Sequence, residues 1–156
     1  MRISIGSDHR GVELKTALAE QLTQAGHEVS DEGPCDSSTS IDYPDIGAAV
    51  GHKVSEQEAD RGILICGSGV GMAITANKFR GVRAVVVSDE NLARLCRQHN
   101  DVNVLCLSGD EPQRASAPDI VKVWLETEFE GGRHARRVDK ISEIEHSCAV
   151  PRGDAP

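Results

Sequence analysis

Residues 62–71 read Gly62-Ile63-Leu64-Ile65-Cys66-Gly67-Ser68-Gly69-Val70-Gly71, an apolar run that passes directly into a glycine-rich turn. The uniformly apolar first half predicts a central strand that is covered on both faces. After the turn, the small residues from Met72 to Lys78 predict a helix. A buried strand that runs through a tight turn into a helix is typical of a parallel α/β sheet.

Strand and helix patterns alternate outward from this stretch in both directions. Short apolar and β-branched runs predict four more strands, at residues 3–6, 28–30, 82–87 and 102–107. Helical spacing of apolar residues predicts helices at residues 14–25, 46–54, 89–98, 120–128 and 136–147. We expect Asp45 to cap the helix at 46–54, and Leu92 and Leu95 to face inward. Repeated strand-helix units predict one α/β domain around a five-stranded parallel sheet.

The composition indicates one acidic globular domain. The chain has 156 residues, with 17 Lys plus Arg, 25 Asp plus Glu and a net charge of −8. We expect a single domain at residues 1–149 and a flexible tail at 150–156. The negative charge and the 3% aromatic content argue against nucleic acid or an anionic membrane as a partner. A small anionic substrate remains compatible if the basic residues converge.

The cysteines and histidines predict reduced thiols and no metal site. The five cysteines include no Cys-x-x-Cys pair, and the N-terminus has no pattern of a signal peptide. No apolar run reaches the roughly 20 residues that a membrane-spanning helix needs. The six histidines show no spacing typical of metal ligands. We therefore expect a cytoplasmic protein without a bound metal.

Polar residues follow the predicted strands at the edge where parallel sheets bind ligands. Cys66 ends a strand at the start of a helix, a position at which a thiol can act as base or nucleophile. The alternative is an inert buried thiol, which is our interpretation of Cys96 and Cys106. The glycine turn can present backbone N–H groups to an oxyanion or phosphate, or it can serve only as a tight turn.

Two further groups are candidates for chemistry. His99 lies in the polar run Gln98-His99-Asn100-Asp101 and could transfer a proton near neutral pH, or be an ordinary surface histidine. Arg133 and Arg137 are four residues apart, so they share a helix face and can bind one phosphate, or make ordinary surface ion pairs.

The chain carries six motifs in this order: Gly6-Ser7-Asp8-His9-Arg10-Gly11, Asp42-Tyr43-Pro44, Ile65 to Gly71, Ala76-Asn77-Lys78-Phe79, Gln98 to Leu105 and Gly131-Gly132-Arg133-His134. From Ile3 to about Glu145 they closely resemble the type B ribose-5-phosphate isomerases. That family also includes the subunits of galactose-6-phosphate isomerase.

The resemblance implies a Rossmann-like three-layer α/β/α sandwich that interconverts a phosphorylated aldose and ketose without a metal or organic cofactor. It also implies a homodimer, in some cases paired into tetramers. Cys66 would be the base that moves a proton between carbons 1 and 2. His99 would assist ring opening, and Asp8 would help with the ring-oxygen or hydroxyl proton.

The resemblance assigns the remaining contacts to substrate binding. The backbone of Gly67, Ser68, Gly69, Val70 and Gly71 would stabilise the enediolate oxygens. His9, Tyr43 and Asn100 would contact the sugar or its phosphate, and Arg133 and Arg137 would hold the phosphate. The His99 and arginine segments would come from the neighbouring subunit, so a monomer would be inactive.

Two positions differ from the pattern of many relatives; one concerns the base and the other concerns the substrate. Some relatives use a Glu just after the glycine turn, but Met72 stands there, which leaves Cys66 as the candidate base. Many relatives carry a phosphate-binding Arg where this chain has Asp110. Ribose 5-phosphate is the default substrate, a four- or six-carbon sugar phosphate is an alternative, and a non-catalytic phosphosugar-binding module is another. A generic nucleotide binder fits the glycine spacing poorly.

Overall fold

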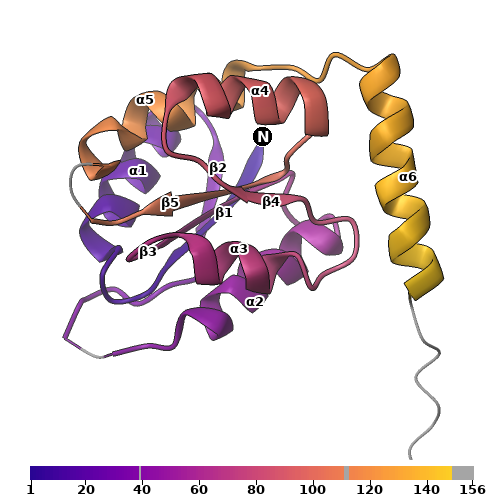
Figure 1. Cartoon of the computed structure of the whole chain (residues 1–156). Helices are drawn as coiled ribbons and strands as arrows, with labels where there is room; N and C mark the ends of the chain where they lie inside the picture. Colours follow the sequence, from indigo (N-terminus) through magenta and orange to yellow (C-terminus); the bar gives the residue numbers. More distant parts are fainter. Residues whose placement is uncertain (39, 111–112, 149–156) are drawn as a thin grey trace, which may run out of the picture.

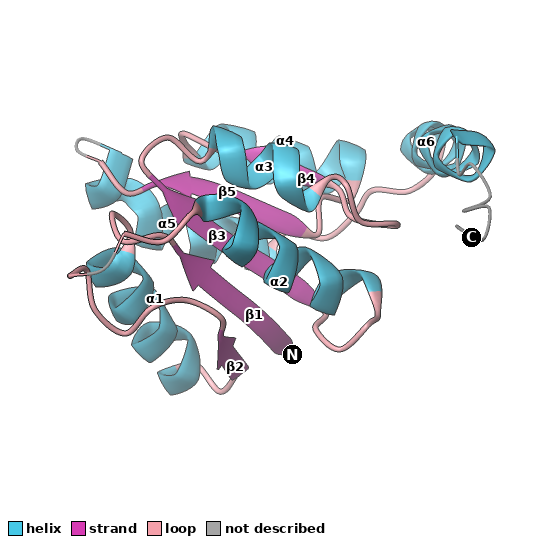
Figure 2. Ribbon diagram, turned by 90° about the horizontal axis from the view of Figure 1, so that it is seen from below, coloured by secondary structure: helices cyan, strands magenta, loops and turns pink. Residues whose placement is uncertain are grey.

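The computed structural model describes residues 1–38, 40–110 and 113–148. Five parallel strands form one sheet with the order β2-β1-β3-β5-β4 and helices on both faces (Figures 1 and 2). This confirms the expected three-layer α/β/α class. The strands are β1 (Arg2–Ser7), β2 (Glu28–Asp31), β3 (Arg61–Cys66), β4 (Ala84–Val86) and β5 (Val104–Ser108).

The two faces of the sheet carry separate apolar cores. Helices α1 (Val12–Gln24), α4 (Glu90–Asn100) and α5 (Gln113–Glu126) pack on one face, where Trp124 is fully buried. Helices α2 (Tyr43–Ser55) and α3 (Val70–Ala76) pack on the other face, against residues that include Leu64 and Cys106. Because β3 alternates its side chains between both cores, its sequence is apolar throughout, as predicted.

The strand order places a crevice between β1 and β3. The chain leaves β1 toward β2 on one side and crosses to β3 on the other, so the connections diverge there. Ligands of open α/β sheets bind at such a switch point, outside the carboxyl ends of the strands. Ser7 pairs with Ile65, and Cys66 pairs with Ser108. Three strands therefore end side by side at this crevice.

The last helix lies at the edge of the molecule, where it contacts α4, and its Glu145 accepts a hydrogen bond from the backbone N–H of Gly81 at 3.0 Å. Helix α6 (Arg133–Cys148) projects beyond α4 at the side of the sheet, as Figures 1 and 2 show. Its residues Ile141 and Ile144 are 48% and 62% exposed. Apolar side chains on a helix that covers no core are typical of an interaction surface. The proposed domain end at 149 and the tail at 150–156 lie outside the described residues.

Several predicted boundaries differ from the structure. Asp42 occupies the N-cap position of α2, and Asp45 lies in its first turn. In α4, Leu92 and Leu95 are half-buried; Leu92 packs against the core as predicted, while the fully buried positions are Ala93, Cys96 and Arg97. The reason is that α4 also packs through the small residues Ala93 and Cys96 and the aliphatic part of Arg97. The spacing of large apolar residues does not predict such contacts.

Helices α5 and α6 also begin earlier than predicted, at Gln113 and Arg133, because their first turns are polar. Strand β4 is shorter than predicted. Among the described residues, no helix is both long and apolar enough to cross a bilayer.

Candidate active site

Cys66 lies at the end of β3 and is 5% exposed. The backbone N–H of Gly69 donates a hydrogen bond to its Sγ at 3.1 Å. Gly69 has φ +75°, and a Cβ there would lie 3.1 Å from the carbonyl oxygen of Leu107. Only glycine fits this left-handed, crowded position without strain. The glycine turn thus directs a backbone donor at the sulfur atom.

A cavity of about 540 Å³ opens above this sulfur at the carboxyl ends of β1, β3 and β5. It unites the predicted residues Asp8, Tyr43, Cys66 and most of the glycine turn. The ring of Tyr43 lies against Gly71, where a Cβ would come within 2.5 Å of the ring. The start of α2 therefore closes one side of the cavity. Its lining consists of Asp8, Arg10, Tyr43, Cys66, Gly67, Ser68, Val70, Gly71, Ile74 and Asp110.

The loop after β1 is held in place by Asp8. Its backbone N–H donates to the carbonyl oxygen of Ile65 at 3.1 Å, and its carboxylate accepts from the backbone N–H of Arg10 at 2.9 Å. Asp8 is 6% exposed. His9 is half-buried, its Nδ1 has no hydrogen-bond partner among the described residues, and it does not line the cavity.

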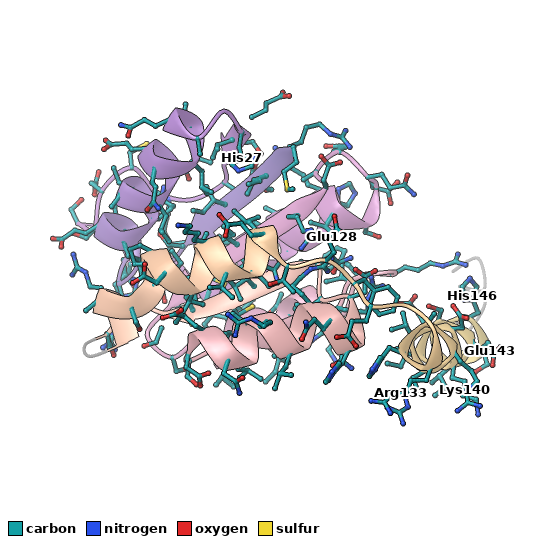
Figure 3. All side chains as sticks on the ribbon, turned by 90° about the horizontal axis from the view of Figure 1, so that it is seen from above. His27, Glu128, Arg133, Lys140, Glu143 and His146 are labelled. Atoms are coloured by element: carbon teal, nitrogen blue, oxygen red, sulfur yellow. The ribbon has the colours of Figure 1, made fainter. Side chains whose placement is uncertain are left out.

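The other predicted residues form a second cluster at the opposite end of the sheet. His99 and Asn100 end α4, which leads into the start of β5, and Arg133 and Arg137 begin α6. Because β5 has five residues that rise ~3.3 Å each, the two ends of the sheet are roughly 16 Å apart. Figure 3 shows Arg133 standing clear of the body on α6. Within one chain the structure does not bring His99 near Cys66.

A charged network shapes the His99 segment. Asp101 caps α4 with φ +48°, and its carboxylate pairs with Arg97 at 2.8 Å and with Arg83 at 2.9 Å. Arg97 is 4% exposed and also donates to the carbonyl oxygen of Val102 at 2.6 Å. These contacts hold the end of α4, and with it His99, in one orientation.

His99 stacks on His134, with ring centroids 4.3 Å apart and planes 3° from parallel. Burial and the neighbouring His99 lower the pKa of His134 from 6.5. The imidazole of His134 is therefore neutral near neutral pH.

The same cluster offers three possible metal ligands. The ligand atoms of His99, Glu130 and His134 lie within 4.8 Å of one another. However, the lone pairs of an imidazole lie in the ring plane, and the two rings are stacked in parallel planes. One ion cannot lie in both planes at the normal Zn–N distance of about 2.0 Å. The arrangement thus fits a shared metal ion poorly.

The two other buried thiols that the structure describes, Cys96 and Cys106, differ from Cys66 in their surroundings. Burial raises the pKa of Cys96 to about 11, and burial also raises the pKa of Cys106. Both pack inside the apolar cores, as predicted. Cys35 is exposed on the loop after β2.

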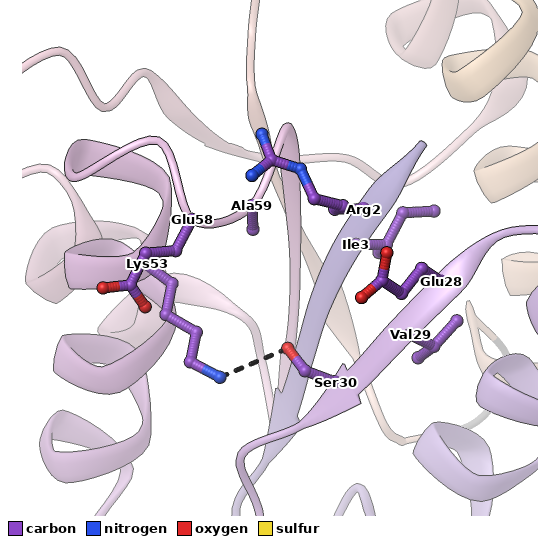
Figure 4. Close-up of a pocket in the computed structure, with 8 residues that line it drawn as sticks. All are labelled: Arg2, Ile3, Glu28, Val29, Ser30, Lys53, Glu58 and Ala59. Carbon is purple, nitrogen blue, oxygen red and sulfur yellow. Dashed lines mark hydrogen bonds between the residues drawn. The ribbon is translucent and has the colours of Figure 1, made fainter.

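A smaller hollow of about 200 Å³ lies between β1, β2 and the end of α2 (Figure 4). It contains none of the predicted residues. Arg2 and Lys53 face Glu28 and Glu58 there, and Lys53 donates to Ser30 at 3.4 Å. The two cations and two carboxylates that line it balance in charge.

Sequence reasoning missed three neighbours of the predicted residues. Arg10 and Ile74 line the Cys66 cavity, and His134 stacks on His99. Arg10 directly follows Asp8 and His9 in the first of the six motifs, so its place in the chain indicated a position at the site. Nothing in the sequence indicated that Ile74 lines the cavity, because an apolar residue in a short helix predicts core packing. In the structure Ile74 is 58% exposed.

Comparisons with known proteins agree with this geometry. The profile of the family described as Ribose/Galactose Isomerase matches residues 3–141. The chain is 46% identical to ribose-5-phosphate isomerase B of Escherichia coli, with 92% of this chain and 96% of that one covered. It is 36% identical to D-erythrulose-4-phosphate isomerase of Pectobacterium atrosepticum, with 94% and 96% covered.

A solved structure is also similar. The crystal structure of ribose-5-phosphate isomerase B from Mycoplasma genitalium, with bound ribulose-5-phosphate, superposes with a TM-score of 0.89. Its sequence is 44% identical, and 93% of this chain and 96% of that chain are covered. The extent of these matches shows that this chain belongs to the ribose/galactose isomerase family.

Proposed function

We propose that the protein is an aldose-ketose isomerase of phosphorylated sugars, with ribose 5-phosphate and ribulose 5-phosphate as its substrate pair. The observation that carries the proposal is the Cys66 sulfur beneath a polar cavity, with a backbone N–H of the glycine turn directed at it. The resemblance to ribose-5-phosphate isomerases of type B supports the same pair.

The chemistry follows from the residues in the cavity. The Cys66 thiolate removes the proton from carbon 2 of the open-chain aldose and returns it to carbon 1, while the hydroxyl proton on oxygen 2 passes to oxygen 1. The negative charge that develops on the sugar oxygen is stabilised by N–H groups of residues 67–71. A positioned base contributes roughly 10²–10⁴-fold, and each oxyanion donor contributes about 10²–10³-fold. This route needs no metal or cofactor.

Ring opening and phosphate binding use the second cluster. His99 assists proton transfer as the furanose ring opens, with Asp8 at the other side of the sugar. Arg133 and Arg137 lie one turn apart on α6 and hold the phosphate between them. His9 and Asn100 contact hydroxyls or phosphate.

A homodimer completes the site. In one chain the two clusters lie at opposite ends of the sheet, so a second copy must supply His99 and the arginines to the cavity of the first. The exposed residues Val70 and Ile74 on α3, and Ile141 and Ile144 on α6, support such an interface. A closed twofold dimer would bury both sets and form two equal sites. We place the protein in the cytoplasm, where its thiols stay reduced.

The length of the sugar is the main alternative. The Pectobacterium relative acts on a four-carbon sugar phosphate, and Asp110 changes the charge at one edge of the cavity. A four- or six-carbon substrate uses the same proton transfer and differs only in its contacts. A non-catalytic module is a weaker alternative, because binding alone does not need Cys66 beneath the cavity.

The test is an assay of the purified protein with four-, five- and six-carbon sugar phosphates in deuterated water. We expect the fastest turnover with ribose 5-phosphate, together with deuterium at the exchanged carbon. The Cys66→Ala variant should lose both turnover and exchange and still bind substrate. Cys35→Ser, which changes an exposed thiol, is the matched control. Full exchange in Cys66→Ala would remove the thiol from the mechanism.

A further inference from the structure

An arginine and an aspartate that sequence reasoning did not connect form an ion pair at the edge of the Cys66 cavity. Nη2 of Arg10 donates to both carboxylate oxygens of Asp110, at 2.9 and 2.7 Å. Both residues line the cavity. Arg10 comes from the loop after β1 and Asp110 from the loop after β5.

The backbone fixes the place of this pair. The two loops pack closely, since a Cβ at Gly109 would lie 3.2 Å from the carbonyl oxygen of Arg10. The Asp8 carboxylate accepts a hydrogen bond from the backbone N–H of Arg10, and the carbonyl oxygen of Cys66 accepts one from the backbone N–H of Gly109 at 2.8 Å. Both ends of the pair are therefore tied to residues of the site.

The guanidinium group lies against the glycine turn. A Cβ at Gly67 would be 3.3 Å from both Cζ and Nε of Arg10. Asp110 engages only Nη2, so Nε and Nη1 have no hydrogen bond to any residue in the described part of the chain. Donors on a guanidinium with a fixed orientation suit an anionic oxygen.

The charges around the cavity favour binding of an anion by these Arg10 donors. Among the described residues that line it, Asp8 and Asp110 are acidic and Arg10 is the one cation. A dianionic ligand would be repelled by two carboxylates. The ion pair to Arg10 offsets the charge of Asp110 and leaves the cation facing the ligand.

We propose that Arg10, oriented by Asp110, binds the phosphate group of the substrate from the Cys66 side of the site. Asp110 is a positioning residue, which acts by holding a long and otherwise mobile side chain that is 55% exposed. The inference rests on the proposed function only in taking the bound phosphate to be that of a sugar.

The experiment measures inorganic phosphate and substrate separately. Binding of inorganic phosphate to the full chain is followed by calorimetry, and kcat and KM are measured for the best sugar phosphate. Arg10→Gln should weaken phosphate binding and raise KM by at least about tenfold, the effect of losing one charge-assisted hydrogen bond. Because Arg10 does not touch the reacting carbons, kcat should fall much less than 1/KM.

A conservative variant separates charge from structure. Arg10→Lys should recover part of the phosphate affinity, because it keeps the cation and loses the planar donors. Arg2→Gln is the matched control: Arg2 pairs with Asp60 at the far end of the sheet with 47% and 43% exposure, against 55% and 48% for Arg10 and Asp110. It should leave phosphate affinity and KM unchanged.

Asp110→Asn tests the positioning role. If Asp110 orients Arg10, this variant raises KM, and the double variant with Arg10→Gln is no worse than Arg10→Gln alone. If Asp110 merely repels phosphate, Asp110→Asn lowers KM, and the positioning role is wrong.

The failure of this inference differs from a failure of the proposed function. Unchanged phosphate affinity and KM in Arg10→Gln overturn the inference while isomerase activity persists. No turnover of any sugar phosphate by the unmodified protein, with phosphate binding still lost in Arg10→Gln, overturns the function and retains the anion site. A protein that binds no phosphate at all overturns the inference directly.

Discussion

The sulfur atoms illustrate how strongly a single residue depends on its surroundings. Cys66 accepts a backbone N–H and borders a cavity, whereas Cys96 and Cys106 are enclosed by apolar side chains. Burial raises the pKa of both enclosed thiols and keeps them protonated and unreactive. The side chain of Cys148 is not among those described.

Alkylation should separate these thiols. At pH 8, iodoacetamide should modify Cys35, which is exposed, and leave Cys96 and Cys106 intact in the folded protein. The pKa of Cys96, raised by burial to about 11, leaves it a neutral thiol at that pH. Mass spectrometry of peptides locates the modification. Modification of Cys96 as fast as Cys35 would contradict the enclosed position.

His134 predicts an acid-side loss of stability. Burial lowers its pKa below the value of 6.5 for an unperturbed histidine, so the unfolded chain binds more protons than the folded one. Stability is then fully present above about pH 6.5 and falls as the pH drops through that value toward the folded pKa. Urea unfolding from pH 7.5 to 5.5 should show this decrease, and His134→Asn should reduce its slope.

The matched control for this titration is His146→Asn, which alters an exposed histidine on the same helix. Its slope should equal that of the unmodified protein. Equal slopes for all three proteins would show that His134 does not cause the pH dependence.

Among the elements, the end of α4 is the one whose geometry depends most on a few charges. Asp101 adopts a left-handed conformation that favours glycine or asparagine, and it neutralises the buried Arg97. Without that carboxylate, the end of the helix has an unpaired buried cation. Because His99 is two residues away, loss of this carboxylate would also change the orientation of His99.

Asp101→Ala should therefore lower the free energy of unfolding by about 2–3 kcal/mol, from the unpaired Arg97 and the left-handed backbone. Asp101→Asn should lower it less, by about 1–2 kcal/mol, because it keeps one acceptor oxygen and tolerates the same φ, while its amide N–H₂ group faces the second arginine. Denaturant titration measures both. A loss in Asp101→Asn as large as in Asp101→Ala would assign the whole effect to charge.

In the whole molecule, the residues of the predicted site lie at two opposite ends of the sheet. The Cys66 cavity lies at the carboxyl ends of the strands, and His99 lies at the end of a helix that runs back to the amino ends. A shared site between two copies follows from this separation if both groups act on one substrate.

Mixing two inactive variants tests the shared site. With the ring-closed aldose as substrate, Cys66→Ala and His99→Asn should each be inactive, and subunit exchange between them should restore about one quarter of normal activity, since half of the dimers are mixed and each has one intact site. Mixing either variant with itself is the control. No recovery, with exchange shown by mass spectrometry, would mean that each chain builds its own site.

The exposed apolar side chains predict the interface. Ile144→Asp on α6 should convert the proposed dimer to an inactive monomer, because Ile144 is 62% exposed and belongs to neither apolar core of its own chain. Light scattering and the isomerase assay measure both effects. Gln24→Asp, at the exposed end of α1, should leave the dimer intact. A monomeric unmodified protein would contradict this assembly.

The sequence by itself determined the α/β class, because the apolar run at 62–66 and its alternating neighbours leave few other ways to bury these residues. It also identified Cys66 and the glycine turn, because residues that follow a strand directly stay beside its end. These are local relations, and local relations can be read along a chain.

Only the tertiary structure decided which distant residues meet. The pairing of Arg10 with Asp110 joins two loops 100 positions apart, and it depends on β1 and β5 both flanking β3. The separation of His99 from Cys66 depends likewise on the direction of α4. Sheet order and helix direction arise from packing of the whole chain, so no motif in the sequence encodes these distances.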